Sequence, residues 1–194
     1  SLQNEKEKNK FLKNYNYKFR GITYYSDFAR VLLLYNYGGC WFDLDIFFLR
    51  NFEPFFFNFE NEVVVYKWET RNYPNNAIFI SLEPNSLKMK KNIEFIINHN
   101  RGWGFQQANL YIGLDIDMLV LSCSWFDAGW ISTPFNKPEE FKNFFKTQEN
   151  EISIDNYYKG SFCYHWHNKW YDIIEKNSPM YYLNKDLEKR LNVF

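Results

Sequence analysis

Two acidic residues one position apart, Asp43 and Asp45, are the strongest candidates for chemistry in this sequence. Carboxylates supply the hard oxygen ligands that Mn²⁺ and Mg²⁺ prefer. A divalent cation held by such a pair can bridge the oxygens of a diphosphate and act as a Lewis acid when that diphosphate leaves. The spacing alone is a weak signal, since it occurs by chance and recurs at Asp115 and Asp117. The elements around the pair must therefore decide its meaning.

The residues before the pair predict a helix that ends at two glycines. Ser26 is expected as its N-cap, and the charge of Asp27 suits the positive end of a helix. One apolar face follows at helical spacing: Phe28, Val31, Leu32 and Tyr35. Asp27 and Arg30 are three residues apart, so they can meet at one ligand. Gly38 supplies the left-handed residue that stops a helix, and Gly39 allows a close turn.

The pair itself lies in an apolar run that predicts a buried strand. Residues 40–42 and 46–49 are apolar and aromatic, which is typical of a strand covered on both faces. Two carboxylates inside such a run are costly to bury unless they bind a cation. Helix, glycine stop and strand together favour the metal interpretation over chance.

The order Ser26-Asp27-x-x-Arg30, Leu34-Tyr35, Gly38-Gly39 and Asp43-x-Asp45 resembles the glycosyltransferase family with a sugar-binding DXD region. Members of that family include initiating mannosyltransferases, capsule and lipopolysaccharide transferases and α-1,4-galactosyltransferase-like enzymes. Three later stretches are similar to the last of these branches: Asn-Asn-Ala-Ile-Phe at 75–79, Gly-Trp-Gly-Phe-Gln at 102–106 and His-Trp-His-Asn-Lys at 165–169. The resemblance covers about residues 22–170.

The resemblance implies an α/β enzyme of the GT-A type, with a mixed central sheet flanked by helices. Such an enzyme transfers a hexose, with retention, from a nucleotide-diphosphate sugar to a glycan or lipid-linked acceptor in polysaccharide biosynthesis; a UDP-hexose is the favoured donor and GDP-mannose the other candidate. The implied metal, Mn²⁺ or Mg²⁺, is held by Asp43, Asp45 and His165. Gln106 is expected near the anomeric carbon, as a catalytic residue beside Asp43 and Asp45. The implied donor-binding residues are Ser26, Asp27, Arg30, Gly38, Gly39, Asn75, Asn168 and Lys169.

The sequence departs from the family pattern at three points. Gln107-Ala108 replaces a Gly-Pro pair, and Asn76 replaces a small glycine. Only 25 residues precede Ser26, where family members carry a βαβ portion that forms much of the nucleoside pocket. Either the sequence is truncated or the enzyme is unusually reduced. The alternative function is therefore a catalytically inactive sugar- or nucleotide-sugar-binding module. A metal-dependent phosphohydrolase is a third, weaker alternative function, because such an enzyme needs several scattered carboxylates and histidines around two metal ions.

Simpler structural interpretations exist for two groups of site residues. If the strand persists through His165 and His167, both imidazoles face the same side and can form a surface site for an adventitious transition metal. Otherwise one imidazole is buried and hydrogen-bonded while the other faces water. Asp27 and Arg30 can be a helix-capping salt bridge, which contributes little on a surface.

Composition agrees with one domain spanning residues 1–194. The 23 basic and 23 acidic residues balance, so there is no electrostatic case for nucleic acid. Three cysteines without CxxC spacing suggest buried thiols in a reducing compartment. We see neither a signal peptide nor an apolar run long enough to span a membrane. These features predict a cytoplasmic protein, with a peripheral membrane location also open.

Helices and strands are expected to alternate along the chain. Strands are predicted at 22–25, 63–68, 77–82, 119–122 and 161–164, and helices at 26–37, 86–102, 106–112 and 138–146, with a short solvated helix or frayed end at 3–13. The phenylalanine-rich stretch 55–59 is expected to be a loop packed on the core rather than a membrane or partner patch.

Overall fold

The computed structural model describes residues 2–12, 21–59, 63–69, 73–99, 118–128, 142–149, 159–165, 167 and 172–191. The chain divides into two compact units. The first unit comprises Ser1–Asp43, Phe52–Lys67 and Arg71–Leu121, and the second comprises Leu44–Asn51, Trp68–Thr70 and Ser122–Phe194. The boundary between the first two segments falls inside the Asp-x-Asp pair, so Asp43 belongs to the first unit and Asp45 to the second.

A four-stranded sheet forms the centre of the first unit, in the order β1 (Gly39–Phe42), β4 (Asn75–Ser81), β3 (Val63–Lys67) and β5 (Leu119–Ser122). β4 pairs antiparallel with both β1 and β3. β4 lies between two neighbours, and its apolar residues from Ala77 to Ile80 are buried, as expected for a central strand. The predicted strands at 63–68, 77–82 and 119–122 are therefore confirmed to within two residues.

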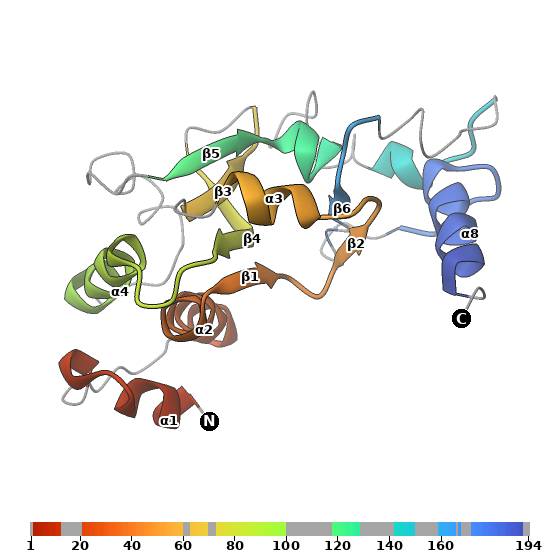
Figure 1. Ribbon diagram of the computed structural model, residues 1–194. Helices are drawn as coiled ribbons and strands as arrows, with labels where there is room; N and C mark the ends of the chain where they lie inside the picture. Colours follow the sequence, from red (N-terminus) through yellow and green to blue (C-terminus); the bar gives the residue numbers. More distant parts are fainter. Residues whose placement is uncertain are drawn as a thin grey trace. The chain divides into compact units, whose positions relative to one another are not determined.

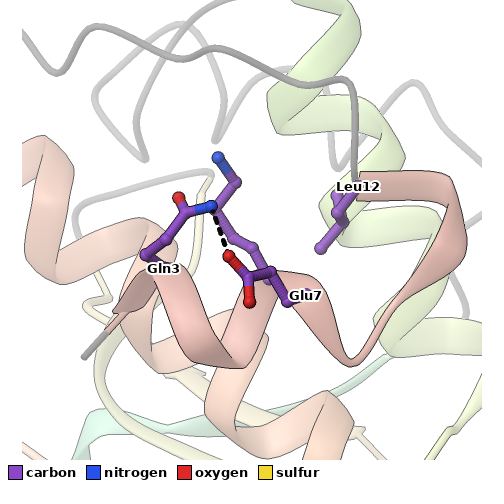
Figure 2. Close-up of a pocket in the computed structure, with 4 residues that line it drawn as sticks. Gln3, Glu7 and Leu12 are labelled. Carbon is purple, nitrogen blue, oxygen red and sulfur yellow. Dashed lines mark hydrogen bonds between the residues drawn. The ribbon is translucent and has the colours of Figure 1, made fainter.

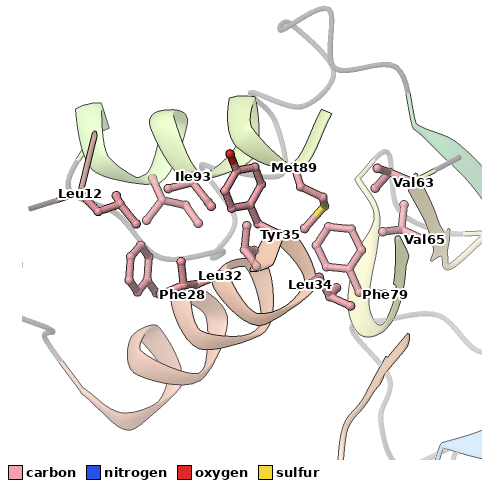
Figure 3. Packing of buried hydrophobic residues seen from close by; sticks show 12 residues of the cluster. Leu12, Phe28, Leu32, Leu34, Tyr35, Val63, Val65, Phe79, Met89 and Ile93 are labelled. Carbon is pink, nitrogen blue, oxygen red and sulfur yellow. The ribbon is translucent and has the colours of Figure 1, made fainter. Parts of the chain in front are cut away.

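Helices α2 (Ile22–Tyr37) and α4 (Leu87–His99) pack beside this sheet (Figure 1). Their apolar faces meet residues of β3 and β4 in one hydrophobic cluster (Figure 3). The cluster consists of Leu12, Phe28, Val31, Leu32, Leu34, Tyr35, Val63, Val65, Phe79, Met89, Ile93 and Ile96. All four residues of the predicted face of α2 belong to it. The architecture is α/β, with a sheet flanked by helices, which is compatible with the predicted fold class.

The start of α2 differs from the prediction. The helix begins at Ile22 with Gly21 as its N-cap, so residues 22–25 are not a strand and Ser26 is not the cap. The backbone amide of Tyr25 donates to the Gly21 carbonyl at 3.2 Å, which extends the helical hydrogen bonds one turn before Ser26. The β-branched and aromatic residues of this turn favour a strand only weakly, and the helical context overrides that preference.

The end of α2 is as predicted. Gly38 adopts a left-handed φ of 68°, and its amide donates to the Leu34 carbonyl at 2.8 Å. A Cβ atom at Gly38 would lie 2.1 Å from the Leu82 carbonyl oxygen, so the position needs glycine for space as well as for conformation. Gly39 also has a positive φ, 105°, but open space around it.

The predicted continuous strand around the acids is two strands. β1 ends at Phe42, and β2 (Ile46–Phe48) begins after the connection that carries Asp43 and Asp45. The break arises because β1 pairs with β4, whereas β2 pairs with β6 (Cys163–His165). The acids are therefore not inside a strand, and each keeps part of its surface in water.

The second unit contains the β2–β6 pair, the 3₁₀ helices η2 (Cys123–Trp125) and η4 (Lys142–Phe145), and helix α8 (Pro179–Leu191). The described part of the predicted helix at 138–146 is η4, while the predicted helix at 106–112 lies outside the described residues. Sequence analysis missed α8 despite a start signal: Ser178 Oγ accepts from the Tyr181 amide at 3.1 Å, directly before a proline at the first helical position.

The described part of the first unit also contains three short helices: α1 (Leu2–Glu7), η1 (Lys10–Leu12) and α3 (Glu53–Asn58). α3 replaces the loop predicted at 55–59, and it buries Phe55 while Phe56 and Phe57 stay exposed. A pocket of about 470 Å³ lies against α1 and η1, lined by Gln3, Lys6, Glu7 and Leu12 (Figure 2). None of the predicted site residues lines this pocket.

The cysteines are free thiols, with Cys123 and Cys163 buried and Cys40 partly buried. Among the helices of the described residues, none has the length and apolar character needed to cross a membrane.

Candidate functional site

Polar side chains gather around each acid of the Asp-x-Asp pair. In the first unit, the arginine cluster consists of Ser26, Asp27, Arg30, Trp41, Asp43 and Asn76. In the second unit, the histidine cluster consists of Asp45, Trp68, Asp127, His165 and His167. Each cluster is built from segments far apart in the sequence.

Arg30 is the centre of the arginine cluster and is almost fully buried. Its Nη1 donates to the Asn76 carbonyl at 2.5 Å, and its Nη2 donates to Ser26 Oγ at 3.2 Å. Nη2 also lies 3.5 Å from Asp27 Oδ1, and this oxygen accepts a hydrogen bond from the side-chain Nδ2 of Asn76 at 3.0 Å. Arg30 and Asp27 thus form a buried ion pair whose two members have further hydrogen bonds to Ser26 and Asn76. The surface-capping interpretation is wrong, because both residues are buried and lie beyond the first turn of α2.

Asp43 joins this cluster through one carboxylate oxygen. Its Oδ1 lies 3.3 Å from Arg30 Nη2 and accepts a hydrogen bond from Trp41 Nε1 at 2.8 Å. The Asp43 amide donates to the Ala77 carbonyl at 2.8 Å, which fixes the backbone at the end of β1. The Asp43 side chain remains 30% exposed. The carboxylate is therefore held in one orientation while part of it stays open to a ligand.

The other first-unit residues predicted to bind a donor have local contacts. Asn75 Oδ1 accepts from the Ala77 amide at 2.7 Å, and Gly38 lies against Leu82. Of the predicted set, Arg30 contacts Asp43 directly, and Ser26 and Asp27 are linked to Asp43 through Arg30. Gln106, Asn168 and Lys169 lie outside the described residues.

The histidine cluster forms because β2 and β6 pair antiparallel, with Ile46 opposite His165. This register brings His165 Nε2 to 3.4 Å from Asp45 Oδ1. On the other side of the ring, His165 Nδ1 lies 3.7 Å from Asp127 Oδ2. The Asp45 side chain is 20% exposed, whereas Asp127 is fully buried. His165 therefore lies between one carboxylate at the surface and one in the interior.

Asp127 is the buried anchor of this cluster, and sequence analysis missed it. Its Oδ2 lies 2.8 Å from His167 Nε2 and accepts a hydrogen bond from Trp68 Nε1, also at 2.8 Å. A possible signal was present, since an acid between Phe126 and Ala128 in an aromatic segment is costly to bury without partners. That signal identifies a buried acid but gives no indication of its partners.

The two imidazoles are stacked, with ring centroids 3.7 Å apart, although the strand on which the same-side expectation depended does not continue to His167. Both histidines are buried, so the interpretations of a surface metal site and of one water-facing imidazole are wrong. β6 ends at His165, and His167 has a positive φ of 52°. A left-handed non-glycine residue costs of order 1 kcal/mol, and such strain concentrates at functional sites.

The pKa values of the three buried groups of the histidine cluster are shifted in different directions. Burial alone would raise the pKa of Asp127, but the field and hydrogen bonds of the two imidazoles lower it to about 2. Burial alone would lower the pKa of His165, but the neighbouring carboxylates of Asp127 and Asp45 raise it to about 9. The pKa of His167 is lowered, because burial outweighs the attraction of Asp127. These shifts favour the protonated form of His165 and the ionised form of Asp127.

The nitrogen and oxygen atoms of the histidine cluster are suitable ligands for a divalent metal ion. Ligand atoms about 2.1 Å from an ion lie roughly 3.0–3.4 Å from one another, and His165 Nε2 and Asp45 Oδ1 are separated by 3.4 Å. Asp127, His165 and His167 also offer three donor atoms within 4.8 Å of one another. Carboxylate and imidazole ligands together are compatible with Mn²⁺.

Comparison with known proteins agrees with the chemistry of the pair. Residues 1–64 match the family model described as the glycosyltransferase sugar-binding region containing the DXD motif. The resemblance to DXD glycosyltransferases is confirmed for residues 1–64, whereas the later stretches at 75–79, 102–106 and 165–169 lie outside the match. The matched region contains the arginine cluster except Asn76, and it contains both acids of the motif, which we now call the DXD motif. Comparisons with curated proteins and with solved structures give no match.

Proposed function

We propose that this protein is a metal-dependent glycosyltransferase, which transfers a hexose from a nucleotide-diphosphate sugar to a glycan or lipid-linked acceptor with retention. The carrying observation is that each acid of the DXD motif is oriented by neighbouring side chains yet stays partly exposed. Asp43 is oriented by Arg30 and Trp41, and Asp45 lies beside His165. Oriented carboxylates that remain accessible suit a metal that arrives with its nucleotide sugar.

Asp43, Asp45 and His165 would hold the metal, Mn²⁺ or Mg²⁺. When bound, it supplies Lewis-acid stabilisation for the negative charge that grows on the leaving diphosphate. His165 would hold the metal only after losing the proton at Nε2, because an imidazole ligand is neutral at the ligating nitrogen. The guanidinium of Arg30 pairs with both Asp27 and Asp43. Because Ser26 and Asn76 also hold this guanidinium, it keeps Asp43 in place.

Donor recognition is assigned by the family resemblance. Ser26, Asp27 and Arg30 would contact the sugar hydroxyls and phosphates, with Gly38, Gly39 and Asn75 shaping the same site. Asn168 and Lys169 would bind phosphate, and Gln106 would lie near the anomeric carbon. A UDP-hexose is the favoured donor, and the 194 residues would act as one domain.

A donor screen tests this function. Calorimetry with UDP-, GDP- and CMP-sugars should find one class that binds in Mn²⁺ and loses at least tenfold in affinity in EDTA. Asp45→Asn should abolish the Mn²⁺-dependent part, because an amide is a poor ligand for a hard cation. Metal-dependent affinity that is unchanged in Asp45→Asn would contradict the assignment.

A measurement of turnover distinguishes an active glycosyltransferase from a catalytically inactive binding module. The wild-type protein should release a nucleoside diphosphate from the bound donor, slowly by hydrolysis and faster when an acceptor is present. Metal-dependent donor binding without any release, across a panel of glycan and lipid-linked acceptors, would instead favour the sugar-binding module.

A further inference from the structure

We propose that Asp127 is a positioning residue for the metal ligand His165: it receives the Nδ1–H of the imidazole and keeps Nε2 directed at Asp45. This inference rests on the proposed function, because a metal at Asp45 and His165 is part of that function. It assigns a role to a buried acid that lies outside the family match at residues 1–64.

The position of His165 between two carboxylates is the first argument. Its Nε2 lies 3.4 Å from Asp45, and its Nδ1 lies 3.7 Å from Asp127. Histidines that bind metals through one nitrogen usually donate the other N–H to a carboxylate or carbonyl, which fixes both the tautomer and the ring orientation. Each nitrogen of the imidazole already lies next to a different carboxylate, which is the orientation that this arrangement needs.

The anchoring of Asp127 is the second argument. A fully buried carboxylate is costly unless hydrogen bonds satisfy it. Trp68 Nε1 and His167 Nε2 both lie 2.8 Å from Asp127 Oδ2, and the chain accepts a left-handed conformation at His167 where it supplies the second contact. These contacts fix the carboxylate independently of His165. Asp127 is thus held in a position from which it can orient the imidazole of His165.

The exposure of the two carboxylates decides their roles. Asp45 is 20% exposed, so an ion that arrives from solvent with a nucleotide sugar can reach it. Asp127 is fully buried, and its Oδ2 already has two close polar partners. Asp45 is therefore suited to bind the metal directly, while Asp127 is suited to orient His165, the other metal ligand. The competing arrangement is a metal bound by Asp127, His165 Nδ1 and His167 together, and it is an outcome of the test.

Nuclear magnetic resonance of the full chain with ¹⁵N-labelled histidine provides the direct test, with Cd²⁺ as a diamagnetic probe. The expected result is a metal-induced shift of His165 Nε2, while its Nδ1 keeps its proton. Binding of Cd²⁺ to His165 Nδ1 and to His167 would overturn the proposal in favour of the competing site. This measurement needs only the wild-type protein, so it decides the matter even if variants of Asp127 do not fold.

Substitution of Asp127 provides the second test. Asp127→Asn should weaken Mn²⁺ binding ten- to a hundred-fold, the range seen when outer partners of metal ligands are lost. His165 should then populate both neutral tautomers, a change that a purely structural role would not produce. The control is Asp172→Asn, which removes an acid of the same unit that is paired with Lys142 at 3.7 Å, and it should bind Mn²⁺ like the wild type.

The outcomes separate this inference from the function on which it rests. Wild-type Mn²⁺ affinity and a single His165 tautomer in folded Asp127→Asn would overturn the inference and leave the proposed function intact. A wild-type protein that binds neither Cd²⁺ nor Mn²⁺, with or without nucleotide sugars, would overturn both.

Discussion

At the scale of single residues, the two acids of the DXD motif have different environments. One carboxylate oxygen of Asp43, Oδ1, contacts both Arg30 and Trp41, whereas Asp45 lies beside His165. The family pattern treats them as one pair, but different side chains orient each one. Substitutions behind Asp43 and behind Asp45 should therefore have separate consequences, which makes the supporting residues as informative as the acids.

Arg30 should contribute strongly to stability as well as to the donor site. Arg30→Ala leaves Asp27 buried without its cation, and breaking a buried ion pair costs about 3–5 kcal/mol. We expect the free energy of unfolding to fall by about 3 kcal/mol in urea titrations. Lys90→Ala is the matched control, since it removes an exposed pair with Glu94 at 3.7 Å and should cost less than about 0.5 kcal/mol. Equal, small losses would mean that the buried pair is not a structural contact, and any effect on donor affinity would then be purely local.

Cys40 should react slowly despite being partly accessible. Burial raises the pKa of its thiol from 9.0 to about 11. The thiolate is the reactive form, so at pH 8 its fraction should be about a hundred-fold smaller than in the unfolded chain. Alkylation by iodoacetamide, followed by mass spectrometry of the Cys40 peptide, should be slower in the native protein by at least this factor. Native and urea-unfolded protein that react at the same rate would contradict the raised pKa.

At the scale of elements, the connection from α2 to β1 depends on one glycine. Gly38 ends the helix in a left-handed conformation and lies against the Leu82 backbone, so it fixes where β1 begins and thus where Asp43 follows. The helix face, its stop and the strand are consecutive in sequence, which explains why the family pattern spans them as one unit.

Gly38→Ala should be far more damaging than another glycine substitution on the same helix. Its Cβ would meet the Leu82 carbonyl oxygen at 2.1 Å in a strained conformation, and we expect a loss of about 3 kcal/mol or more. Gly21→Ala adds a Cβ with nothing within 4 Å, at an extended φ of 167°. It should change stability by less than about 1 kcal/mol. Thermal unfolding of the two variants measures the difference, and similar melting temperatures would contradict the packing role.

At the scale of the whole molecule, the chain passes repeatedly between the two compact units. The second unit takes Leu44–Asn51 and Trp68–Thr70 from within the sequence of the first, so neither unit is one continuous segment. Domains that unfold separately usually have few chain crossings between them. The prediction of one domain leads us to expect that the 194 residues unfold together.

Hydrogen exchange tests that cooperativity. Ile93→Ala removes a fully buried side chain of α4 in the first unit and should cost about 2–5 kcal/mol. In one cooperative domain, the slowest-exchanging amides of β4 and of β6 should lose the same free energy of protection. Leu87→Ala, at an exposed position of the same helix, is the control and should leave both unchanged. Loss of protection in β4 alone would mean that the second unit unfolds independently.

The sequence by itself determined the local elements and the chemistry of the motif. The spacing of Phe28, Val31, Leu32 and Tyr35 predicted the buried face of α2, and Gly38 predicted its end. These signals are local, because helical periodicity and a left-handed conformation are properties of neighbouring residues. The order of residues from Ser26 to Asp45 likewise carried the family resemblance, since it is a pattern along the chain.

Only the tertiary structure decided what surrounds the two acids. β1 and β2 pair with different strands, which breaks the predicted strand at Asp43 and Asp45. Trp68, Asp127 and His165 come together from three distant segments to form the support behind Asp45. Strand pairing and buried polar contacts join residues that are far apart in sequence, and no local pattern specifies their partners. The motif could therefore be found in the sequence, whereas the side chains that hold it in place could not.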